Sequence, residues 1–149
     1  MIEQMRFGQA VELGEELGPV LVTPTHDQVY AILEFSSGTT PDPKSRFLDV
    51  EAAKAMGLAG PMVHAGLLEA YLTKLLTDWT GPKGTLQTIN LEFRRAAVHD
   101  EELGCYGRIT DTREEGGDTV VKLDIFLQKA DGDCPVQGVA EIRLPTQPS

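Results

Sequence analysis

The residues that could do chemistry are few in this chain, and their spacing argues against two kinds of site. His26, His64 and His99 are isolated from one another in the sequence, so none is placed like a metal ligand. Cys105 and Cys134 lie far apart and form no CxxC motif, so we expect both to be small buried residues. The sequence therefore predicts neither a metal site nor a disulfide.

His64 is the best placed of the three histidines, because it immediately precedes the longest apolar helix that the sequence predicts. The first amides of a helix have no partner within it and lie at the positive end of its dipole. The N–H groups of Ala65 and Gly66 are therefore candidate donors to an oxyanion. His64 itself is either a packed, hydrogen-bonded residue, the commoner role at such a position, or a general base.

The helix predicted over residues 65–79 is apolar around most of its circumference. It leaves only a narrow polar stripe of Glu69, Thr73 and Thr77, so it should be buried on most sides. The apolar face consists of Leu67, Leu68, Ala70, Tyr71, Leu72, Leu75, Leu76 and Trp79.

Two shorter helices precede it. Thr25 begins a T-x-x-Q capping box, and the helix that it starts should end at Gly38. Asp49 can cap a second short helix that Gly57 ends. Residues 38–48 hold two prolines and a glycine and should form an irregular loop.

Alternating apolar residues predict strands on both sides of these helices. A short strand covers residues 20–23, and a longer one covers residues 85–94, with Phe93 facing the interior. Three more strands follow, joined by turns at residues 114–118 and 131–133. The predicted fold class is α+β, with a curved antiparallel sheet wrapped around the central helix in one domain. Residues 1–16 and 145–149 should be peripheral or frayed.

Charge and hydropathy narrow the function classes. The net charge of −10 makes nucleic-acid binding unfavourable, because such a field repels polyphosphate. An anionic ligand needs a local gathering of basic residues, for which the adjacent Arg94 and Arg95 are candidates, unless they are only solvated charges. No apolar stretch is long enough to cross a bilayer, and the N-terminus does not resemble a signal peptide, so we expect no membrane association and a cytoplasmic location.

Residues 36–72 carry a pattern of short helices and loops that is similar to one in a known protein family. A short helix leads to a proline-rich loop, a helix begun by Asp49, and the run GLAGPMVHAG at residues 57–66. This pattern resembles the signature region of MaoC-like acyl-thioester hydratases and dehydratases, and the strands after Gly84 follow in that family's order. The resemblance implies a hot-dog fold, an acyl-CoA thioester substrate with no separate cofactor, and a homodimer or a heterodimer with a second hot-dog subunit.

The chain departs from the family where the chemistry lies. In the family, an Asp and a His of a Gly-Asp-x-Asn-Pro-x-His loop deprotonate the water that adds to an α,β-double bond. Counting back from Asp49 places Asp42 at the aspartate, Lys44 at the asparagine and Phe47 at the histidine. Phenylalanine cannot accept a proton, so Asp42 needs burial in an apolar tunnel beside Phe47 to become a useful base. An aspartate in a P-D-P loop also commonly bonds its own backbone.

Three interpretations stay open: a hydratase or dehydratase, a non-catalytic partner subunit of one, and a hot-dog thioesterase. The missing histidine favours a partner subunit, and the run LTDWTGP at residues 76–82 resembles small degenerate subunits of heteromeric MaoC-like hydratases that act on steroid side-chain CoA thioesters. Retention of Asp42 and of the helix start favours an enzyme. The candidate catalytic residues are Asp42 and His64, and the candidate oxyanion and substrate-binding residues are Ala65, Gly66, Phe47 and Arg94.

Overall fold

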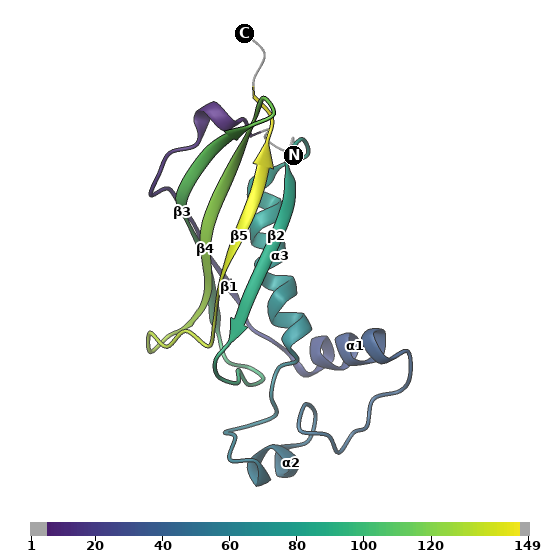
Figure 1. Cartoon of the computed structure of the whole chain (residues 1–149). Coiled ribbons are helices and arrows are strands. Elements are labelled where there is room, and N and C mark those ends of the chain that lie inside the picture. The colour runs from purple at the N-terminus through teal and green to yellow at the C-terminus, as the bar shows by residue number, and fades with distance from the viewer. Residues whose placement is uncertain (1–5, 147–149) are drawn as a thin grey trace.

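The structure is a computed structural model that describes residues 6–146, and it consists of one curved sheet and a long helix (Figure 1). Neighbouring strands are antiparallel and follow the order β1-β3-β4-β5-β2. The elements are β1 (Glu16–Val22), α1 (His26–Ser37), α2 (Val50–Ala55), α3 (Ala65–Thr80), β2 (Thr85–Phe93), β3 (Leu103–Glu115), β4 (Asp118–Lys129) and β5 (Val136–Leu144), preceded by a 3-10 turn at Gly8–Ala10.

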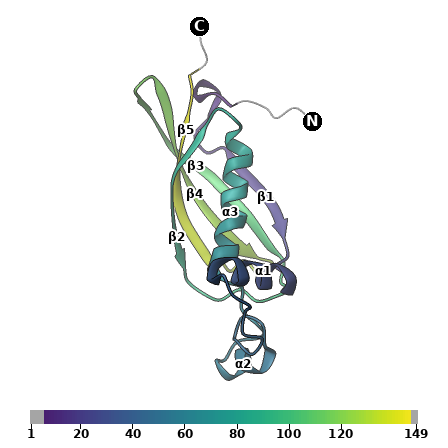
Figure 2. The same ribbon diagram turned by 90° about the vertical axis from the view of Figure 1, so that its right-hand side faces the viewer.

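Helix α3 lies along one face of the sheet, which curves around it (Figure 2). Four of its leucines are 0–7% exposed and pack against inward-facing residues of the strands. Each such burial contributes about 1.5–3 kcal/mol to stability. The predicted wrapping of a curved antiparallel sheet around this helix is confirmed. The four leucines are Leu68, Leu72, Leu75 and Leu76.

One flank of α3 is more exposed than the sequence predicted. Ala70 was expected on the buried face, but it is exposed, like Glu69 and Lys74 beside it. The reason is that five strands curl only part of the way around the helix, so the sheet covers one side of it.

The strands follow the predicted alternation with two differences. β1 begins at Glu16 and not at residue 20. Phe93 is 45% exposed, because it lines a hollow that separates it from the first turn of α3. The predicted β3–β4 hairpin is present, and Gly116 and Gly117 both have positive φ, as a two-residue turn between such strands requires.

The described parts of the chain ends are fastened to the body. Gly8 N donates to Pro145 O, and Arg6 Nε donates to Trp79 O over 2.6 Å. The indole Nε1 of Trp79 donates in turn to Glu15 Oε2 over 3.2 Å. Residues 1–5 and 147–149, which belong to the segments expected to be peripheral, lie outside the described residues.

Residues 24–63 form an arm that carries α1 and α2 beyond the end of the sheet (Figure 1). Their predicted caps are present: Thr25 Oγ1 accepts from Gln28 N, and Asp49 Oδ2 accepts from Ala52 N. The arm leaves large apolar side chains in solvent, including Phe35 at 85% exposure and Met56 at 60%.

Candidate active site

The start of α3 is built around His64, which occupies the N-cap position. Its Nδ1 atom accepts a hydrogen bond from Gly66 N over 3.0 Å. A neutral histidine that accepts at Nδ1 carries its proton on Nε2. In this geometry Nε2 can donate but cannot take a proton from water, so His64 acts as a helix cap and is poorly arranged to be a general base.

The same bond changes the expected oxyanion site. Gly66 N–H was a candidate donor, but it is already used by His64. Ala65 N–H donates to no other described residue, so it is the donor that this helix start leaves available. The sequence places both amides at the helix start, but it does not reveal that the His64 side chain accepts from one of them.

Asp42 belongs to the arm and is exposed. Its Oδ1 accepts from Lys44 N over 3.0 Å, which is the local turn that an aspartate between two prolines often makes. The burial in an apolar tunnel that would make it a useful base is not found in this chain, because the loop that carries it lies outside the core.

Phe47 occupies the position at which the resemblance placed a histidine. Its ring is half-buried and lies 5.5 Å from the ring of His64, centroid to centroid. The guanidinium carbon of Arg46 lies 4.5 Å from the centroid of the same ring. The space beside His64 therefore contains an apolar ring that can pack but cannot transfer a proton.

A hollow of about 270 Å³ lies beside the start of α3. It brings together two of the predicted residues, Ala65 and Arg94, whereas Asp42, Phe47, His64 and Gly66 do not line it. Arg94 Nη1 donates to Gln137 Oε1 over 3.2 Å, while Arg95 is held by both carboxylate oxygens of Asp133. The hollow has mainly apolar walls, formed by Met62, Val63, Leu68, Phe93, Ala96 and Ala97.

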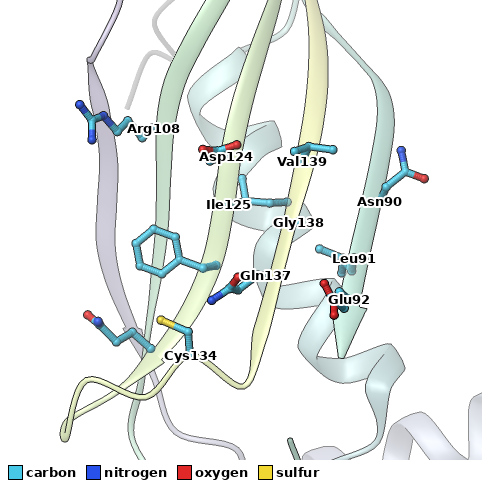
Figure 3. A pocket seen from close by; sticks show the side chains of 12 residues that line it. Asn90, Leu91, Glu92, Arg108, Asp124, Ile125, Cys134, Gln137, Gly138 and Val139 are labelled. Atoms are coloured by element: carbon cyan, nitrogen blue, oxygen red, sulfur yellow. The ribbon is translucent and has the colours of Figure 1, made fainter. Parts of the chain in front are cut away.

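A larger hollow of about 760 Å³ opens on the other face of the sheet, away from α3 (Figure 3). Strands β2, β3, β4 and β5 supply its walls, and none of the predicted site residues lines it. The ring of Phe126 in this wall stacks on Tyr106 at 5.0 Å. Cys134 also lies here and is partly exposed, whereas both cysteines were expected to be buried; only Cys105 is. Its place in the β4–β5 loop, outside the core, explains the difference.

Two histidines that are isolated in the sequence meet in the fold. The rings of His26 and His99 lie 5.9 Å apart in an edge-to-face arrangement. His99 Nε2 is buried and has no hydrogen-bond partner among the described residues. No signal in one sequence could have revealed this pair, because the contact joins the start of α1 to the loop between β2 and β3.

Within residues 6–146, no three histidine, cysteine or acidic side chains gather as metal ligands would. None of the helices in this range is long and apolar enough to cross a membrane.

No protein-family model matches the sequence. Comparison with proteins of curated function found no match either.

Solved structures do match the fold. The (R)-hydratase from A. caviae involved in PHA biosynthesis has a TM-score of 0.79 and 22% identity over 92% of this chain and 99% of its own. A MaoC-like dehydratase from Rhodospirillum rubrum has a TM-score of 0.78 and 15% identity, over 97% of this chain and 99% of its own. The ChsH1–ChsH2 complex from Mycobacterium tuberculosis has a TM-score of 0.73 and 16% identity over 89% and 98%. The chain therefore has the hot-dog fold that MaoC-like dehydratases and R-hydratases share.

Proposed function

We propose that this chain is a subunit of an acyl-CoA thioester hydratase or dehydratase, and that it works with a second hot-dog subunit that supplies the Asp/His pair. The observation that carries the proposal is the state of the signature loop. Phe47 packs against His64 where the resemblance places the catalytic histidine, and Asp42 is exposed and bonded to its own loop. Hydration needs a base that takes a proton from water as its oxygen adds to the β-carbon.

What the chain retains is suited to binding. The hollow beside α3 offers apolar walls for an acyl group, and the N–H of Ala65 can donate to a thioester carbonyl oxygen. Arg94 at the rim of this hollow supplies a positive charge for a phosphate of coenzyme A. Coenzyme A enters as part of the substrate in this proposal.

The two edges of the sheet support assembly with a second chain through β2. On the other edge, β1 has a break in register between Leu17 and Val20, and Pro19 within it lacks an N–H. β2 also shifts register against β5, between Leu86 and Thr88, but its nine residues include no proline or glycine and one charged side chain, Glu92. Such an edge is open to pairing with another strand.

The arm supports the same assembly. Phe35 and Met56 on the arm are largely exposed, and Phe93 at the end of β2 is exposed beside the hollow. A second hot-dog chain paired with β2 would lie close to the hollow and could cover these side chains. A chain that resembles this one in fold occurs in the ChsH1–ChsH2 complex, which supports a partner subunit here.

The proposal is tested by assaying the chain alone and mixed with a homologue that has the intact Asp/His pair, ideally one encoded by an adjacent gene. The substrates are a panel of enoyl-CoA thioesters that differ in the acyl group. We expect the chain alone to be about 100-fold to 10,000-fold less active than the complex, the usual range for a missing general base. Full hydratase activity of the chain alone would overturn the proposal.

A further inference from the structure

The arm is joined to the sheet through one short loop, residues 96–100. Pro24 O, where the arm begins, accepts from Asp100 N over 2.8 Å. Where the arm ends, Pro61 O accepts from His99 N over 3.0 Å and Val63 N donates to Ala97 O over 2.8 Å. The root of the arm is therefore tied to this loop, while Val29 in the core and the bond from Tyr71 Oη to Gln28 Oε1 over 2.6 Å hold α1 against α3.

A side-chain contact reinforces these backbone bonds. His26, the first residue of α1, places its ring edge-to-face against His99 in the loop. On its other side, the His26 ring is stacked on Tyr30 with 6.4 Å between centroids. The contact fixes the start of α1 to the loop, as long as the two imidazoles can lie together.

The surroundings of His99 favour its uncharged form. Burial lowers the pKa of His99 below its ordinary value of 6.5, and His26 lowers it further, while the Phe47 carbonyl and the Asp100 carboxylate oppose this. His26 Nδ1 lies 3.8 Å from the exposed carboxylate of Asp27. Glu101, the next acid in the loop, lies 3.4 Å from Lys129.

We propose that the His26–His99 pair is a pH-sensitive contact that helps to hold the arm in place at neutral pH and favours its release on acidification. His99 Nε2 is buried and has no hydrogen-bond partner among the described residues, so a proton added there would lie unpaired, although the half-buried ring keeps the Phe47 carbonyl as a partner. Two charged rings would also repel each other across 5.9 Å. Since the arm carries Asp42 and Phe47, its release would withdraw the signature loop from the start of α3; the inference holds whether or not the chain is part of a hydratase.

The sign of the effect follows from proton linkage. With the arm seated, His99 binds a proton less readily than it would in a released arm, where the ordinary value of 6.5 applies. The contact therefore stabilises the seated arm fully above pH 6.5. This stabilisation is lost as the pH falls through the lower pKa that His99 has in the seated state. One linked proton can raise the ratio of released to seated arm by up to about tenfold per pH unit in this window.

Amide exchange measured by NMR between pH 7.5 and 5.0 tests the proposal, with protection factors corrected for intrinsic rates. The amides of Val63, His99 and Asp100, which bond across from the arm to the loop, should lose up to about tenfold in protection between pH 6.5 and 5.5, while amides in the middle of β4 keep theirs. In His99→Phe, which retains a ring but cannot titrate, this loss should disappear. An equal loss in His99→Phe would overturn the proposal.

A second measurement decides the matter if His99→Phe does not fold. The chain has three histidines, so their ring signals can be followed individually through a titration. His26→Phe retains stacking on Tyr30, and it should raise the pKa of His99 and reduce the acid loss of protection. If protection at the arm root stays constant while the His99 ring protonates in the wild-type chain, the contact is not pH-sensitive and the proposal fails.

Discussion

Replacing Asp42 by asparagine separates a structural role from a catalytic one. In the structure the carboxylate is exposed and its Oδ1 accepts one hydrogen bond, from Lys44 N over 3.0 Å. Asparagine retains this acceptor, so the free energy of unfolding should change by less than about 0.5 kcal/mol. Asp42→Ala deletes the acceptor and should cost at most about 1 kcal/mol, because a single exposed hydrogen bond is worth little more.

The expected activities follow from the partner-dependent proposal. In a complex with a second subunit that has the intact Asp/His pair, both variants should hydrate enoyl-CoA within about twofold of the unchanged complex, measured as the initial loss of the conjugated thioester's absorbance. If Asp42 were the general base, both would fall by a factor of about 100 to 10,000. A fall of that size with unchanged unfolding curves would refute the reasoning and make this chain the catalytic subunit.

Four further outcomes follow from the structure. Phe47→His should raise the activity of the isolated chain less than about tenfold, because Asp42 stays exposed and bonded to Lys44. The lost contact with Arg46 should lower the free energy of unfolding by about 0.5–1 kcal/mol. A gain in activity near 100-fold would show that the Asp/His dyad can be rebuilt. Leu72→Ala should lower the free energy of unfolding by about 2–5 kcal/mol in urea denaturation, and a loss under 1 kcal/mol would contradict its place in the core. Burial raises the pKa of the Cys105 thiol to about 11, so iodoacetamide at pH 8 should label Cys134 first and Cys105 only on unfolding. Equal labelling rates of the two cysteines, measured by mass spectrometry, would contradict this. Because β2 leaves an open edge, light scattering at micromolar concentration should find a species of two chains and not a single 16.2 kDa chain, for the protein alone or mixed with its partner. A monomer under both conditions would count against pairing at β2.

Features that depend on neighbouring residues were predictable from the sequence. Thr25 and Asp49 cap their helices as predicted, because the bond each makes reaches only three residues along the chain. The two glycines of the β3–β4 turn have the backbone conformation that their residue type favours. The burial of α3 followed from apolar side chains at helical spacing, a pattern that one sequence displays fully.

What the sequence could not predict depends on distance or on rotamers. His26 and His99 belong to segments that only the tertiary fold brings together. The capture of the Gly66 amide by His64 depends on one side-chain rotamer. Phe93 has the residue type and spacing of an inward-facing position, and its exposure reflects a hollow formed by segments distant in the chain. The partly exposed Cys134 illustrates the same limit, because residue type alone does not determine burial.

The placement of β1 has a consequence for the order of folding. Strands β3, β4 and β5 are consecutive hairpin neighbours, whereas β1 pairs with residues 103–108 of β3 and β2 pairs with β5. Local pairings close short loops and form early, while pairings between distant segments must pay a larger loop entropy first. We therefore expect the three-strand meander to nucleate folding and β1, although synthesised first, to dock late. Until it docks, the edge of β3 is bare, and newly made chains are most open to mispairing during that interval.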